Sequence, residues 1–154
     1  MADLDNIVND ILDLECDFKA ELSTDKESAK DDGTFEGYAS VFNNKDLGND
    51  VIKQGAFAKS IYDKKPKLLY QHKTDEPIGV IDSLSEDARG LKIKGRLAMG
   101  TQKGKEVFEL MKMGALDSMS IGYKLSPDDY KYSDKLKKRT ITNLDLMEIS
   151  MVTF

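Results

Sequence analysis

The amino-acid sequence contains a single cysteine, Cys16, so it cannot form an internal disulfide bond, which favours a reducing compartment. It also contains a single histidine, His72, so a zinc site built from several His and Cys ligands is excluded. Any reaction that needs an imidazole must use His72. No apolar run approaches the roughly 20 residues that cross a membrane, and the first residues lack the basic start and apolar run of a secretory signal. We therefore expect no membrane partner.

Positive charge is scarce as well. The 154 residues include 23 Lys and Arg against 28 Asp and Glu, which gives a net charge of −5. Binding to a phosphate backbone needs a concentrated positive face, so nucleic acid is not an expected partner. What the sequence does have is 40% hydrophobic and 33% charged residues, which is typical of one soluble globular domain.

The first thirty residues differ in character from the rest. Apolar side chains at helical spacing in Leu4–Leu12 predict an acidic amphipathic helix. Alternation in Cys16–Leu22 predicts a half-buried strand, and the polar run Ser23–Gly33 predicts a mobile loop. We therefore divide the chain into residues 1–30, with this helix, the strand and the start of the loop, and residues 31–154, within what we expect to be a single domain overall.

Many short extended segments follow, with few helical stretches between them. The predicted strands are residues 34–42, 51–52, 67–72, 78–84, 91–98, 119–125 and 141–154. Helices are predicted to begin at residues 55 and 101, and residues 124–138 are predicted to be a polar loop. This order predicts a mixed β fold with peripheral α-helices, namely a closed or nearly closed β-barrel surrounded by a few helices.

Two polar side chains stand where catalytic chemistry could be assembled. His72 ends an extended segment, a position at which a lone histidine is more often solvated or structural than catalytic. Ser120 lies on a predicted strand with Ser118 facing the same way, so Ser118 is the next candidate for a nucleophile. Gly122 stands beside them and leaves room for a substrate backbone.

Glu148 gives the sharpest signal, because it lies in an otherwise apolar strand. By simple alternation it shares a strand face with Leu144, Leu146, Ser150 and Val152. An ionised carboxylate on a buried face is costly unless it is paired or hydrogen-bonded. In one interpretation Glu148 faces solvent or pairs with a Lys or Arg. In the other it orients an imidazole. With one histidine in the chain, Ser120, His72 and Glu148 form a candidate catalytic set of nucleophile, general base and orienting carboxylate.

Short motifs recur in a characteristic order from about residue 34 to the C-terminus. They are Gly37-Tyr38-Ala39-Ser40-Val41-Phe42, Gly55-Ala56-Phe57, Leu69-Tyr70-Gln71-His72, Pro77-Ile78-Gly79, Met119-Ser120-Ile121-Gly122-Tyr123 and Met147-Glu148-Ile149-Ser150-Met151-Val152-Thr153. The series resembles the prohead (capsid-maturation) proteases of tailed bacteriophages, a family related to the herpesvirus assemblins. The resemblance leaves residues 1 to about 30 outside it.

The resemblance implies an assemblin-like β-barrel surrounded by helices, and a serine endopeptidase. It places the family's histidine on His72, its nucleophile on Ser120 and its acidic third member on Glu148. It implies no metal and no organic cofactor. Members of the family usually continue past the final strand, so we expect Phe154 to be a shortened or self-processed end.

The resemblance also implies partners and a location. The expected substrate is the scaffold region of the major capsid protein precursor, together with the chain itself through autoproteolysis. Cleavage would take place inside the immature capsid, or prohead, in the cytoplasm of the bacterial host. The related assemblins dimerise, so the resemblance also implies self-association of this chain. The sequence itself shows no self-complementary surface that would form the interface.

Two other interpretations compete with the serine endopeptidase. A non-enzymatic scaffold or capsid-binding module on the same fold has no reason to keep His72, Ser120 and Glu148 together in the matched motifs. A cysteine hydrolase that uses Cys16 and His72 is disfavoured, because Cys16 lies on the apolar face of an alternating strand. The oxyanion hole has candidates in backbone N–H groups near Ser120 and Gly122, or in Arg139.

Overall fold

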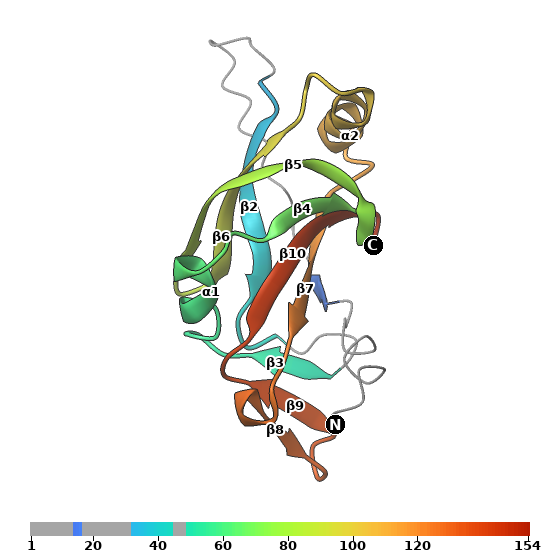
Figure 1. Cartoon of the computed structure of the whole chain (residues 1–154). Coiled ribbons are helices and arrows are strands. Elements are labelled where there is room, and N and C mark those ends of the chain that lie inside the picture. The colour runs from blue at the N-terminus through green and yellow to red at the C-terminus, as the bar shows by residue number, and fades with distance from the viewer. Residues whose placement is uncertain (1–13, 17–31, 45–48) are drawn as a thin grey trace.

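The computed structural model describes residues 14–16, 32–44 and 49–154 of the chain. In this part it contains ten strands and two α-helices (Figure 1). The strands are β1 (Leu14–Cys16), β2 (Thr34–Val41), β3 (Asp50–Ile52), β4 (Lys67–Tyr70), β5 (Lys73–Glu86), β6 (Gly90–Leu97), β7 (Ser118–Lys124), β8 (Tyr130–Ser133), β9 (Lys138–Ile141) and β10 (Asp145–Val152). The helices are α1 (Ala58–Tyr62), α2 (Gln102–Lys112) and the short 3-10 helix η3 (Pro127–Asp129).

The N-terminal predictions fall largely outside the described residues. The predicted helix Leu4–Leu12 lies wholly outside them, and of the predicted strand Cys16–Leu22 only Cys16 lies inside, at the end of β1. In the part of the chain that the structure does describe, no helix is long and apolar enough to cross a membrane.

Seven strands form one curled sheet in the order β1-β7-β10-β4-β5-β6-β2 (Figure 1). The curl brings β2, at one edge, into contact with β7 and β1 near the other edge. The prediction of a mostly β fold with a few helices is confirmed. The predicted closed or nearly closed barrel is wrong, because among the described strands β2 pairs with β6 alone and the sheet remains an open half-barrel. Strand β1 is only three residues long and pairs with β7, so it does not bridge the gap.

The inner side of the curl is filled by apolar side chains that alternate along the strands. Fully buried examples are Phe35, Leu68, Ile78, Leu91, Ile93, Met119, Ile121, Tyr123 and Ile149. Helix α2 adds Val107, Phe108 and Met111 to this core. Burying one such side chain contributes about 1.5–3 kcal/mol, so the core holds strands β4, β7 and β10 firmly beside one another.

Residues 124–138 do not form the predicted polar loop. They contain η3 and β8, and β9 begins at Lys138, so that β3, β9 and β8 make a second sheet of three strands (Figure 1). Strand β9 pairs antiparallel with β8 and parallel with β3, with Arg139 opposite Asp50. These two residues are 89 positions apart, so a local polarity pattern could not reveal the pairing.

A buried carboxylate of the small sheet links it to the large sheet. The Arg139 guanidinium donates two hydrogen bonds to the Asp50 carboxylate, at 2.9 Å to Oδ1 and 2.8 Å to Oδ2. The Tyr123 hydroxyl, from β7 of the large sheet, donates to the same Oδ2 at 3.2 Å. Asp50 is only 2% exposed, so this carboxylate depends on these donors for its burial.

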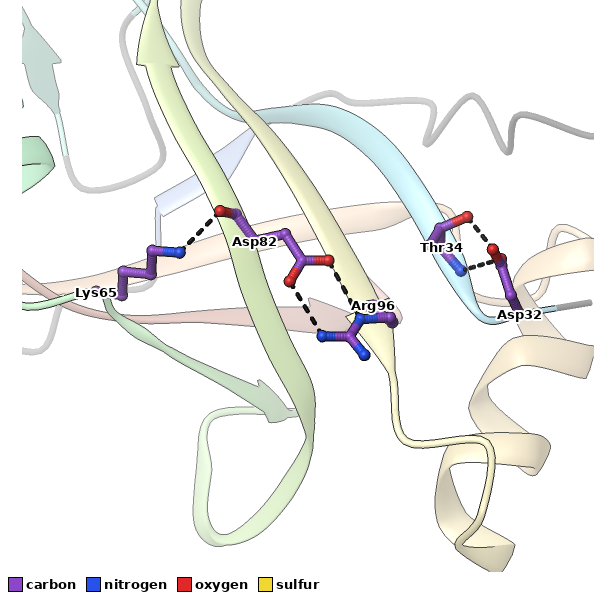
Figure 2. A network of polar contacts seen from close by, with 5 residues as sticks. All are labelled: Asp32, Thr34, Lys65, Asp82 and Arg96. Carbon is purple, nitrogen blue, oxygen red and sulfur yellow. Dashed lines mark hydrogen bonds and ion pairs between the residues drawn. The ribbon is translucent and has the colours of Figure 1, made fainter.

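The outer face of the large sheet carries its own polar network (Figure 2). Asp82 is the extra residue of a β-bulge in β5, where the register with β6 shifts between Ile81 and Ser83. Its carboxylate accepts two hydrogen bonds from Arg96 at 3.3 Å, and its carbonyl accepts one from Lys65 at 2.8 Å. Both charged side chains are about half exposed, so the network positions the bulge more than it stabilises the fold.

Candidate active site

His72 lies in the tight turn between β4 and β5. Strand β4 ends at Tyr70, and both Gln71 (φ 51°) and His72 (φ 58°) adopt the left-handed conformation. This conformation costs an ordinary residue roughly 1–2 kcal/mol, so neighbouring contacts must hold it. The Gln71 N–H donates to Met151 O at 3.0 Å, and the Gln71 side-chain amide donates to Thr153 Oγ1 at 2.6 Å. The turn is thereby fastened to the end of β10.

Glu148 lies on β10, but its neighbours differ from those that simple alternation predicted. The register between β10 and β7 shifts between Leu146 and Glu148, which makes Met147 the extra residue of a β-bulge. A shift of one residue moves side chains to the other face. Leu146 therefore points into the core, and Glu148 shares the opposite face with Ser150 and Val152. The prediction that Leu146 lies on the face of Glu148 is wrong for this reason.

The side chains of His72 and Glu148 are in direct contact. His72 Nδ1 forms a hydrogen bond with Glu148 Oε1, and the two side chains are 19% and 12% exposed. A carboxylate can only accept, so the proton of this bond belongs to Nδ1. In the neutral ring, Nε2 is then the acceptor nitrogen, which is the arrangement that a general base requires.

Gly122 provides the space that the Glu148 carboxylate occupies. It is the residue of β7 directly opposite Glu148. A Cβ at this position would lie 2.5 Å from Glu148 Oε1 and 3.0 Å from the adjacent carboxyl carbon. The prediction that Gly122 leaves room for a substrate backbone is therefore corrected, since this room is filled by the carboxylate.

Ser120 lies on β7 two residues before Gly122, and its side chain is on the same face. It is 1% exposed and stands directly opposite Ser150 of β10. Side chains opposite each other on paired strands lie about 4.5–5.5 Å apart at Cβ. Its hydroxyl is buried, and within the described residues it has no hydrogen-bond partner. A hydroxyl held in this way is available to a general base, and catalytic hydrogen bonds often tighten only when substrate binds.

Ser118, the next candidate nucleophile, lies in different surroundings. It is only partly buried, and its hydroxyl donates to Asp117 Oδ1 at 3.0 Å. Arg139, a candidate for the oxyanion hole, is held by Asp50 in an ion pair between the neighbouring strands β9 and β3 of the small sheet. Both residues are therefore weaker candidates than the sequence alone indicated.

Ser150 was placed on the face of Glu148 by its spacing, but the sequence reasoning gave it no role. In the structure it is fully buried, and its hydroxyl contacts both Glu148 Oε2 (2.7 Å) and the backbone nitrogen of His72 (3.0 Å). A serine two residues after an acidic residue in an apolar strand was the available signal. Its contact with His72 spans 78 positions of sequence and could not be inferred.

Lys103 of helix α2 contacts residues on both strands that flank the His72 turn. The Lys103 ammonium lies 3.8 Å from the centre of the Tyr70 ring and 3.9 Å from Glu76 Oε2. These contacts brace both strands that flank the turn. The part of the chain that the structure describes has no cluster of three or more His, Cys, Asp or Glu side chains that could hold a metal ion.

Comparison with known proteins gives a consistent family. A family model described as caudovirus prohead serine protease matches residues 19–154. The prohead protease of Enterobacteria phage HK97 is 40% identical over 126 residues, which are 79% of this chain and 55% of that protein. The prohead protease of Escherichia phage T5 is 30% identical over 135 residues, which are 85% of this chain and 62% of that protein. The chain therefore spans little more than half the length of these relatives.

The fold has a solved counterpart as well. The structure of the bacteriophage T4 capsid assembly protease superposes with a TM-score of 0.62 and covers 79% of this chain and 82% of that one. Its identity is 9%, so the likeness concerns the fold alone. The family match, in contrast, covers every strand from β2 to β10 together with His72, Ser120 and Glu148. The chain belongs to the caudovirus prohead serine protease family.

Proposed function

We propose that this chain is a serine endopeptidase of prohead maturation. It cleaves the scaffold region of the major capsid protein precursor, and itself, inside the immature capsid in the host cytoplasm. One observation carries the proposal: His72 contacts Glu148 on the sheet face that also holds the buried hydroxyl of Ser120. The proposed catalytic unit is residues 31–154, preceded within the same domain by residues 1–30, whose strand β1 pairs with β7 of the large sheet.

In the proposed reaction, Ser120 Oγ attacks the scissile carbonyl carbon while His72 Nε2 takes the hydroxyl proton. His72 then returns this proton to the leaving amine, the peptide bond breaks, and an acyl-enzyme remains on Ser120. A water molecule, deprotonated by His72, attacks the acyl-enzyme and releases the new carboxyl end. Glu148 remains ionised throughout and stabilises the imidazolium that forms twice in each cycle.

Partial burial makes the Glu148 charge effective. With side-chain exposures of 19% for His72 and 12% for Glu148, the pair lies in a medium of lower dielectric than water, where the attraction between carboxylate and imidazolium is stronger. His72 carries each proton transfer, so the proposed mechanism uses no metal and no organic cofactor. Backbone N–H groups near Ser120 remain the predicted oxyanion donors, and each such donor contributes about 3–4 kcal/mol.

The test compares two serines of the same strand face. Wild-type protein should cleave capsid precursor and react with a serine-directed phosphonate, and Ser120→Ala should do neither. Ser118→Ala is the matched control, and it should retain both activities. Full processing by Ser120→Ala would refute the assignment. An assembly module without enzymatic activity would bind the precursor uncleaved and would leave the phosphonate unreacted.

The partnership of Ser120 with His72 has its own test. His72→Ala should be as inactive as Ser120→Ala, and the double variant should be no worse than either, because the two residues act as a unit. Additive losses in kcat/KM would show that they act separately. Self-association stays a prediction that sedimentation of the purified chain would check.

A further inference from the structure

One buried hydroxyl joins the two parts of the proposed site that come from distant segments of the chain. Ser150 Oγ lies 2.7 Å from Glu148 Oε2 and 3.0 Å from the backbone nitrogen of His72. Ser150 is 0% exposed, so water does not substitute for either contact. Both contacts converge on groups that the proposed mechanism needs.

The directions of these two hydrogen bonds are determined by chemistry. The backbone N–H of His72 can only donate, and an ionised carboxylate can only accept. The Ser150 hydroxyl therefore accepts from His72 and donates its single proton to Glu148. Because that proton is committed, Ser150 is not the nucleophile, although it stands directly opposite Ser120.

The two contacts of Ser150 restrain His72 in two ways, directly at its backbone and indirectly through the Glu148 carboxylate that binds its ring. Glu148 is held at Oε2 by Ser150 and at Oε1 by the His72 ring, which defines the plane of the carboxylate. The backbone of His72 is held at the left-handed turn, where its φ is 58°. Loss of the hydroxyl would free the carboxylate to rotate and would remove one restraint on the turn.

We infer that Ser150 is a positioning residue of the proposed protease, which sets the orientation of the His72 ring toward Ser120 by binding both the backbone of His72 and the carboxylate of Glu148. The inference rests on the proposed function. Ser150 acts through these two groups and does not itself touch substrate.

Ser60 offers a matched control. It is also buried, at 4% exposure, and its hydroxyl also makes one donated and one accepted hydrogen bond, to Leu144 O and from Leu146 N, both at 3.0 Å. Ser60→Ala therefore also removes a buried hydroxyl with one donated and one accepted hydrogen bond, but its partners are the backbone of Leu144 and Leu146 and not His72 or Glu148. An effect of Ser150→Ala that is absent in Ser60→Ala is therefore due to the lost contacts with His72 and Glu148, and not to the loss of a buried hydroxyl in general.

The experiment combines kinetics with a spectrum of the imidazole. His72 is the only histidine of the chain, so its ring resonances need no assignment by mutation. In the wild type, the Nδ1 proton bonded to Glu148 should resonate far downfield. Ser150→Ala should shift or broaden this resonance and lower kcat about 10- to 100-fold with KM little changed. Ser60→Ala should leave both the resonance and kcat as in the wild type.

Ser150→Cys serves as the conservative variant, because a thiol is a weak donor of similar shape. Its kcat should lie between those of the wild type and Ser150→Ala. If Ser150→Ala does not fold, the kcat and the His72 resonances of Ser150→Cys test the inference in its place. Wild-type kcat in a folded Ser150 variant would overturn the inference, and so would a loss of kcat with unchanged His72 resonances. Failure of the proposed function is distinguishable. In that case the wild type would leave precursor uncleaved, or Ser120→Ala would still process it, while the His72 resonances would still respond to Ser150→Ala.

Discussion

Replacing Gly122 by alanine is expected to disable the protease without unfolding it. The new Cβ would lie 2.5 Å from Glu148 Oε1, whereas ordinary contact begins near 3.4 Å, so the oxygen must retreat by about 0.9 Å. N–H···O hydrogen bonds span only about 0.5 Å in length, roughly 2.7–3.2 Å. The bond from His72 Nδ1 to Glu148 is therefore lost or severely distorted.

The size of the effect is bounded from both sides. A misplacement of about 1 Å in an active site costs about 10²-fold in rate, and loss of the carboxylate in a comparable triad costs about 10⁴-fold. For Gly122→Ala we therefore expect kcat/KM to fall by about 10² to 10⁴, or about 2.7–5.4 kcal/mol in the activation barrier. The fold should survive, because the clash is with the end of a side chain and not with backbone.

The assay is cleavage of capsid precursor, with the melting temperature measured on the same preparation. Gly100→Ala is the matched control, since a Cβ at Gly100 meets nothing within 4 Å. It should cleave at the wild-type rate. Wild-type turnover by a folded Gly122→Ala protein would refute the reasoning, because it would show that the observed position of the carboxylate is not needed for catalysis.

Three further predictions concern Glu148 itself, the buried ion pair of the small sheet and the Tyr38–Asp87 hydrogen bond. Glu148→Gln should lower kcat about 10⁴-fold with the melting temperature nearly unchanged, and normal turnover would remove Glu148 from the mechanism. Arg139→Ala deprives the buried Asp50 of its bidentate partner and should lower the free energy of unfolding by about 3–5 kcal/mol in a urea titration, while the folded fraction still turns over normally. The Tyr38 hydroxyl donates to Asp87 and lowers the pKa of that carboxyl below its usual 3.8. A lowered folded-state pKa contributes stability above the unfolded-state value that is lost as pH falls through the folded one, so Tyr38→Phe should show a shallower loss of stability below about pH 4.

The residue types of the candidate site could be selected without a structure. A chain with one histidine leaves one candidate general base, and an acidic residue within an apolar strand is costly enough to indicate a partner. Period-two alternation and turn residues also predicted most strands of the large sheet. The strand predictions and the contact between Glu148 and His72 are confirmed, because each depends on local composition and spacing, which the sequence states directly.

The faces and contacts of those residues were decided by tertiary structure. The bulge at Met147 reverses the alternation of β10, and it is visible only in the pairing of β10 with β7. The use of Gly122 as space for Glu148, the bridge from Ser150 to His72 and the pairing of Asp50 with Arg139 join segments that are far apart in sequence. The sequence by itself determined which side chains could carry the proposed chemistry. Which of them meet was decided by strand register across the sheet, because a shift of one residue exchanges the two faces of a strand.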